Sequence, residues 1–134
     1  MYLLDTNVIS ELRKNRPHGA VLSWLKSVPG EQLFLAAVSL GEIQSGIEIT
    51  REQDPEKAAT LEKWADLLAE TQQVLPMDAR IFRIWARLIH RTSNTLQEDA
   101  MIAATAVGHQ LTVVTRNVRD FTGFPVTTLN PFDS

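Results

Sequence analysis

Cysteine is absent from the 134 residues, which excludes disulfide bonds, thiolate metal ligands and a cysteine nucleophile. Histidine is scarce as well, because His18, His90 and His109 are the only three and lie far apart in the sequence. A zinc site built from cysteine and histidine is therefore not expected. The net charge of −3 provides no general attraction to nucleic acid, so any such contact needs a local basic patch or a bridging metal ion.

Long hydrophobic runs are also missing. No apolar stretch reaches the roughly 18 residues that a membrane-spanning helix needs. The first residues lack the charged region and long apolar stretch of a secretory signal. We therefore expect a cytoplasmic protein without membrane contact. The length predicts one domain over residues 1–134, and 44% hydrophobic residues is ordinary for a globular core.

Short apolar runs alternate with longer segments of helical periodicity. The runs predict strands at 2–4, 33–38, 74–77 and 111–115, with a possible edge strand at 125–129. The periodic segments predict helices at 6–14, 19–28, 39–51, 55–73, 79–89 and 98–109. Ser39 and Glu42 have the spacing of a capping box at the start of the third helix. The alternation predicts an α/β fold, a parallel sheet covered by helices on both faces.

Acidic residues recur where these strands end. Asp5 directly follows the first strand, and Glu42 falls in the first turn after the second. Asp99 begins the helix before the fourth strand, and Asn117 and Asp120 follow that strand. Right-handed crossovers place all carboxyl ends of parallel strands at one edge, where open α/β sheets bind ligands. We therefore expect these side chains to gather at one edge of the sheet.

Such a cluster of acids needs a compensating cation. Two carboxylates about 4 Å apart repel by roughly 4 kcal/mol at an effective dielectric constant near 20. Mg²⁺ and Mn²⁺ prefer oxygen ligands, and either ion can activate water while shielding a phosphate group. The chemistry that this site favours is in-line hydrolysis of a phosphodiester bond.

Each acid also has an ordinary structural interpretation. Asp5 could only cap the first helix, and Glu42 could be half of a capping box. Asp99 could favour its position through the helix dipole, and Asp120 could form an Asx turn. None of these roles excludes metal binding, and only the joint placement at one edge favours a shared site.

Four sequence blocks resemble the PIN-domain family, and in particular its VapC and FitB toxins. The similar blocks are Leu-Leu-Asp-Thr-Asn-Val-Ile-Ser at 3–10, residues 39–46, residues 99–106 and residues 111–121, followed by Leu-Asn-Pro-Phe at 129–132. The resemblance implies a three-layer α/β/α sandwich and a Mg²⁺- or Mn²⁺-dependent ribonuclease. It also implies the toxin of a type II toxin–antitoxin pair, a homodimer silenced by an antitoxin. Operator DNA would be bound only through the antitoxin complex.

The resemblance carries roles to particular residues. Asp5, Glu42 and Asp99 correspond to the acidic metal ligands, and the Thr6 and Thr115 hydroxyls are expected to hold those ligands in place. The fourth acidic position stays open between two residues. Family members have an acid either at the position of Asn117 or three residues later, where Asp120 stands. We expect Asp120 to contribute more, because a neutral amide is a poor substitute for a carboxylate toward Mg²⁺.

Basic residues near the predicted site are candidates for holding RNA; they are Arg13, Lys14, Arg16, Arg116 and Arg119. A second basic set lies opposite the apolar stripe of helix 79–89 and comprises Arg80, Arg83, Arg87 and Arg91. That set is interpreted either as a solvated helix face or as a track for RNA phosphates.

Two other functions fit parts of the pattern. A degenerate PIN module would bind RNA or protein without cleavage, and the neutral Asn117 favours this alternative. An aspartyl-phosphate enzyme would use Asp5 as acid or nucleophile. Such phosphatases usually carry a second aspartate two residues later, where this chain has Asn7.

Overall fold

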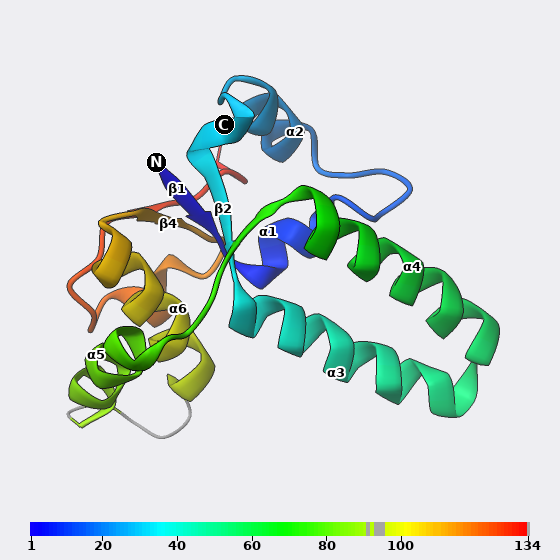
Figure 1. Cartoon of the computed structure of the whole chain (residues 1–134). Helices are drawn as coiled ribbons and strands as arrows, with labels where there is room; N and C mark the ends of the chain where they lie inside the picture. The colour runs from blue at the N-terminus through cyan, green and yellow to red at the C-terminus, as the bar shows by residue number, and fades with distance from the viewer. Residues whose placement is uncertain (91, 93–95, 134) are drawn as a thin grey trace.

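A short parallel sheet lies between two layers of helices in the computed structural model, which describes residues 1–90, 92 and 96–133 (Figure 1). The strands are β1 (Tyr2–Leu4), β2 (Leu33–Ala36), β3 (Gln73–Leu75), β4 (Thr112–Val114) and β5 (Thr128–Leu129). They pair in the order β3-β2-β1-β4-β5, and every pair is parallel. β1 therefore occupies the centre of the sheet, and its carboxyl end opens at the middle of one edge.

Helices account for most of the remaining chain. The α-helices are α1 (Thr6–Glu11), α2 (Gly19–Lys26), α3 (Ala37–Gln53), α4 (Pro55–Thr71), α5 (Ala79–Ile89) and α6 (Gln97–His109). The short 3₁₀ helices are η1 (Gly30–Gln32) and η3 (Val118–Phe121). Across the described residues, none of the helices combines the length and the apolar composition that crossing a membrane requires.

Side chains of the central strands alternate between two hydrophobic clusters. Leu3 and Val113 pack with α6 and with partly buried residues of α5. Leu4 and Val114 face the other way and pack with α1, α2 and α4. Because successive residues of a strand point to opposite faces, these adjacent pairs serve two different layers. The predicted α/β/α sandwich with a parallel sheet is confirmed.

The capping box predicted at Ser39 is wrong. The run 33–38 divides, so that β2 ends at Ala36 and α3 begins at Ala37 without an intervening loop. Ser39 is then buried inside the helix, and its hydroxyl has no hydrogen-bond partner among the described residues. Glu42 consequently lies in the second turn of α3. Hydrophobic periodicity does not mark such a junction, because a short apolar run suits a buried strand and a buried helix equally.

Other helix-start signals agree with the structure. The Asp78 carboxylate caps α5 by accepting a hydrogen bond from the Ile81 amide at 3.0 Å. Pro55 occupies the first residue of α4, where its missing N–H costs nothing. Element ends differ by a few residues, since α1 ends at Glu11 and β5 includes only Thr128 and Leu129.

The contact between α5 and α6 depends on Gly108. A Cβ atom at this position would overlap Cδ1 of Ile81, whose side chain is fully buried. The Arg80 guanidinium also donates to the Gly108 carbonyl at 2.9 Å. We expect Gly108→Ala to lower the free energy of unfolding by about 1–3 kcal/mol, as overpacking typically does. Urea denaturation measures the change.

Gly41→Ala is the matched control for this substitution. Gly41 also lies within a helix, and a Cβ atom there meets nothing within 4 Å. Alanine should therefore stabilise the protein by about 0.5–1 kcal/mol, because it reduces the backbone entropy lost on folding. Equal stability of the two variants would contradict the close α5–α6 packing.

Candidate metal and active site

Asp5 is held at the carboxyl end of β1 by groups from two strands and a helix. Its amide donates to the Val114 carbonyl at 2.9 Å, which continues the pairing of β1 with β4. Its carboxylate accepts hydrogen bonds from the Thr6 amide at 2.8 Å and from the Thr115 hydroxyl at 2.7 Å. The residue is only 5% exposed. Asp5 therefore caps α1, as the ordinary interpretation predicted, and also presents a fixed carboxylate at the sheet edge.

Asn7 links Asp5 to the segment after β4, a role that the sequence did not reveal. Its amide nitrogen donates to the Asp5 carboxylate at 3.2 Å, and its carbonyl accepts from the Arg116 amide at 3.2 Å. The Thr115 hydroxyl accepts from the Asn117 amide at 3.0 Å. The only sequence signal was the place of Asn7 in the motif that follows the first strand.

Glu42 reaches the same edge from α3. Its Oε1 accepts a hydrogen bond from the Thr6 hydroxyl at 2.9 Å, so Thr6 joins the first helix to the third. Burial, together with the neighbouring carboxyl groups of Glu98 and Asp5, raises the pKa of Glu42 to about 7, although the hydrogen bond from Thr6 acts in the opposite direction. Glu98 was not predicted as a site residue. Its position next to Asp99 in the first turn of α6 was the available signal.

Asp99 lies at the start of α6, which begins at the same edge because α6 runs back along the parallel sheet to β4. Burial, together with the charges of Asp5, Asp120 and Glu98, raises the pKa of Asp99 to about 6. Burial also raises the pKa of Asp5, and the charge of Asp120 adds to that effect. Asp120 is thus close enough to interact with both other aspartates.

Asn117 and Asp120 differ in how they face this cluster. Asp120 is half-buried and contributes its charge to the pKa of Asp5 and of Asp99. Asn117 is exposed, and its backbone amide donates a hydrogen bond to the Thr115 hydroxyl of the site. Asp120 thus adds charge to the cluster, whereas the contact of Asn117 with Thr115 is made by its backbone amide.

The donor set suits a hard divalent cation in its chemistry. The carboxylates of Asp5, Glu42, Asp99 and Asp120 lie near one another at one edge of the sheet. The Thr115 and Thr6 hydroxyls donate hydrogen bonds to Asp5 and Glu42, respectively. Their mutual repulsion and burial disfavour the charged forms, and a cation would reverse that penalty. Over residues 1–90, 92 and 96–133, however, no three Asp, Glu or His side chains converge closely enough to enclose an ion.

Three of the candidate RNA-binding residues lie beside the acidic site. Arg13 lies in a pocket that Thr6 and Glu42 also line. Arg116 stacks over the Phe132 ring at 4.7 Å, and Arg119 lines a shallow pocket beside Asp120.

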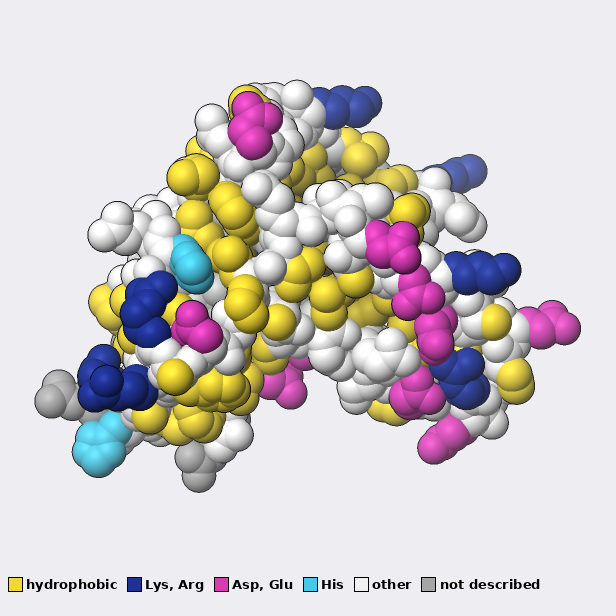
Figure 2. All heavy atoms as spheres, viewed as in Figure 1, with side chains coloured by type: hydrophobic (Ala, Val, Ile, Leu, Met, Phe, Trp, Pro, Cys, Tyr) yellow, Lys and Arg dark blue, Asp and Glu magenta, His cyan; other side chains and the backbone are white. Residues whose placement is uncertain are grey.

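The remaining basic residues lie elsewhere. Lys14 forms an ion pair with Glu11 at 3.1 Å, and Arg16 is exposed beyond α1. Arg80, Arg83 and Arg87 are exposed on α5, over which basic side chains gather in Figure 2. Arg91, the last residue of that predicted set, lies outside the described residues.

Comparison with known proteins places this arrangement in a family. The family model described as "PIN domain" matches residues 2–124, which include every acidic residue of the site. The chain belongs to the PIN-domain family. This PIN-domain chain is 32% identical to "Toxin FitB" of Neisseria gonorrhoeae, over 98% of this chain and 99% of that protein.

Two further similarities extend along the whole PIN-domain chain. It is 34% identical to "VapC ribonuclease Y4jK" of Sinorhizobium fredii, over 99% of each chain. A solved structure titled "Structure of FitAB bound to IR36 DNA fragment" matches with a TM-score of 0.83 and 31% identity, covering 100% of this chain and 97% of that chain. The predicted resemblance to VapC and FitB toxins is confirmed.

Proposed function

We propose that this protein is a Mg²⁺- or Mn²⁺-dependent endoribonuclease and the toxin of a type II toxin–antitoxin pair. The observation that carries the proposal is the buried, hydrogen-bonded Asp5 facing the charges of Glu42, Asp99 and Asp120 at the carboxyl edge of the sheet. Similarity to proteins named as toxins and ribonucleases supports the same conclusion.

Asp5, Glu42, Asp99 and Asp120 would hold the metal ion. Such an ion, when bound, lowers the pKa of water and offsets charge on a phosphate. Asp5 supplies a fixed anchor, because Thr115, Asn7 and the Thr6 amide orient its carboxylate. The Thr6 hydroxyl orients Glu42 in the same way. The Asn7 bridge to Arg116 keeps the segment after β4, and with it Asp120, against the start of α1.

RNA would bind at this edge of the sheet through the basic side chains of the protein that lie there. Arg13, Arg116 and Arg119 lie beside the acidic residues and are the strongest candidates for contacts with phosphate groups. Lys14 is less available for this role because Glu11 already pairs with it. A weak net charge of −3 leaves RNA attraction to these local groups and to the metal ion.

The proposed partner is an antitoxin protein. The matched structure is that of FitAB bound to a DNA fragment. By this similarity, we propose that the chain is silenced by a small cognate protein and reaches operator DNA only within that complex.

The alternative of a PIN module without cleavage is favoured by one observation. Among the described residues, no three acidic side chains converge closely enough to enclose a metal ion, and Asn117 is neutral. Such a module would bind the metal ion or RNA and leave the RNA intact. The aspartyl-phosphate alternative is less favoured, because Asn7 occupies the relevant position and is bonded to Asp5.

Purified protein incubated with total bacterial RNA tests the proposal. We expect cleavage with Mg²⁺ or Mn²⁺ and none with EDTA, because the clustered carboxylates require a cation to act together. Expression alone should slow the growth of a bacterial host, and co-expression of the small protein from the adjacent reading frame should restore it. Metal binding without cleavage would support the alternative, and unchanged growth with intact RNA would contradict the toxin assignment.

A further inference from the structure

A pocket of about 250 Å³ lies between α1, α3 and α4 and adjoins the acidic site. Thr6 and Glu42 lie in its wall, so it shares a border with the site instead of forming a separate cavity. The α3–α4 hairpin extends away from the sheet on the side of α1 (Figure 1). A ligand in this pocket would therefore lie beside any phosphate held at the acidic edge.

Gly46 leaves the wall of this pocket without a side chain at one position of α3. It lines the pocket in the interior of α3, and a Cβ atom there would meet nothing within 4 Å. Glycine within a helix is destabilising relative to alanine, and no neighbouring atom in the described chain explains its presence. The position does not need glycine for packing, but a larger side chain would occupy the space of a ligand.

The walls of the pocket match a planar ring with polar edges. Apolar surface comes from Ile43, Ile47, Leu61 and Trp64. Hydroxyl groups of Ser10 and Thr50 can form hydrogen bonds, and Arg13 is the basic residue in the wall. Aromatic and aliphatic faces stack on bases, while a guanidinium contacts phosphate.

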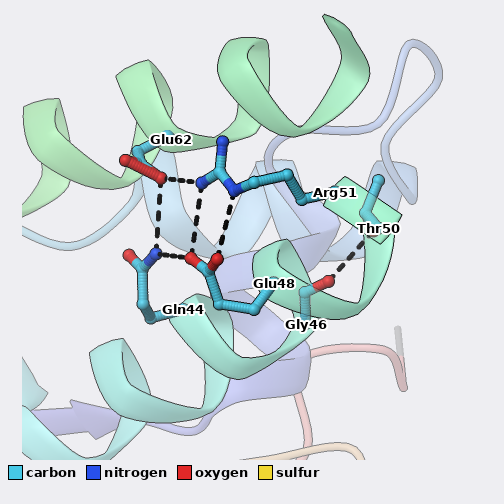
Figure 3. A network of polar contacts seen from close by, with 6 residues as sticks. All are labelled: Gln44, Gly46, Glu48, Thr50, Arg51 and Glu62. Atoms are coloured by element: carbon cyan, nitrogen blue, oxygen red, sulfur yellow. Dashed lines mark hydrogen bonds and ion pairs between the residues drawn. The ribbon is translucent and has the colours of Figure 1, made fainter. Parts of the chain in front are cut away.

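Polar contacts connect α3 and α4 beside the pocket (Figure 3). The Arg51 guanidinium pairs with Glu48 on its own helix and with Glu62 on α4. Gln44 donates to Glu48 at 2.6 Å and to Glu62 at 3.4 Å. The Thr50 hydroxyl donates to the Gly46 carbonyl at 2.9 Å, which leaves its oxygen free to accept from a ligand. The pocket therefore lies between two helices that side-chain contacts connect.

We propose that this pocket binds one base of the RNA strand next to the phosphodiester bond that is cleaved. The inference rests on the proposed ribonuclease function and adds to it a site for base preference. Its volume is slightly below the roughly 300–1,000 Å³ of sites for drug-sized ligands, which suits a single nucleotide. Acidic side chains along the α3–α4 hairpin (Figure 2) disfavour a longer RNA track there, so Arg13 and the acidic edge limit binding to one nucleotide.

Titration with the four nucleoside 5′-monophosphates in the presence of EDTA tests the pocket without cleavage. We expect saturable NMR shifts of the Gly46 and Ile47 amides and of the Trp64 indole, with one base binding more tightly than the others. Gly46→Leu should abolish these shifts. Gly41→Leu is the matched control, because it lies in the same helix outside the pocket and also has open space around its Cβ position.

Cleavage of an RNA library with a randomised segment tests the same pocket during turnover. We expect Gly46→Leu to lower kcat/KM by about tenfold or more, the scale of one lost base-stacking contact, and to remove the base preference beside the cut. Arg13→Gln, an exposed change that cannot disrupt the core, should raise KM with the preference retained. Gly41→Leu should cleave as the wild type does.

The outcomes separate the two proposals. Wild-type binding and base preference in Gly46→Leu would overturn the pocket assignment, as would shifts caused by the antitoxin but by none of the monophosphates. A wild-type protein that never cleaves RNA would instead overturn the proposed function, and the titration alone would then decide whether the pocket binds a base.

Discussion

Glu42→Gln and Asp99→Asn should each lower RNA cleavage by at least about tenfold, or roughly 1.4 kcal/mol in the activation barrier, without loss of stability. The expected loss follows from the removal of a charged ligand. Burial and neighbouring acids raise the pKa of Glu42 to about 7 and of Asp99 to about 6, so their charges oppose folding in the absence of a cation. Neutral amides remove this penalty, and the free energy of unfolding should stay equal or rise.

A paired measurement separates this function from a structural role. Cleavage with Mn²⁺ and urea denaturation in EDTA should be measured for each variant and for Glu52→Gln. Glu52 lies on the same helix as Glu42 but is exposed and outside the site, so its variant should match the wild type in activity. Full activity of both site variants would contradict the assignment, and activity lost together with stability would indicate a structural role.

Asp5→Asn is expected to behave differently. Its carboxylate accepts hydrogen bonds from the Thr6 amide, Asn7 and Thr115, and an amide group brings donors where these groups already donate. The variant should therefore lose at least tenfold in activity, about 1.4 kcal/mol, and also some stability, because a buried polar atom is left without a partner. This contrast makes Glu42 and Asp99 the cleaner probes of metal chemistry.

Asp120→Asn should weaken Mn²⁺ affinity by about tenfold or more, while Asn117→Ala should change it by less than about threefold. The Asp120 charge interacts with both Asp5 and Asp99, so its loss removes attraction for a dication. Asn117 is exposed, and its contact with Thr115 uses the backbone amide, which alanine retains. Asn117→Asp should preserve or increase the affinity because it adds a carboxylate near the same edge.

Isothermal titration calorimetry of the three variants measures these affinities, and Asp133→Asn serves as an exposed control beyond β5. The reverse order, with Asp120→Asn like the wild type and Asn117→Ala weakened, would assign the fourth position to Asn117. Equal weakening by both would indicate that the two residues share it.

Much of the fold could be predicted because the strands and helices of each layer have their own spacing of hydrophobic residues in the sequence. The strand runs around Leu3–Leu4 and Val113–Val114 and the stripe of α5 all follow from which side chains face the core. The junction at Ala36–Ala37 could not be predicted, because apolar residues continue from the strand into the helix without a turn residue between them. The local hydrophobic pattern therefore predicted the strands and helices themselves better than the residues at which they begin and end.

For the site, the positions of Asp5 and Glu42 after strands and of Asp99 at the start of the helix before β4 can be read from the sequence, and a parallel topology predicts a common edge for them. The neighbours that orient these acids and shift their pKa values are visible only in the folded protein. The Asn7 bridge to Arg116 and the hydrogen bond from Thr6 to Glu42 join segments up to 109 residues apart, and the Glu98 charge acts on Glu42 from another helix. Hydrogen bonds and pKa shifts depend on distances of a few ångströms in space, and spacing along the chain does not encode them.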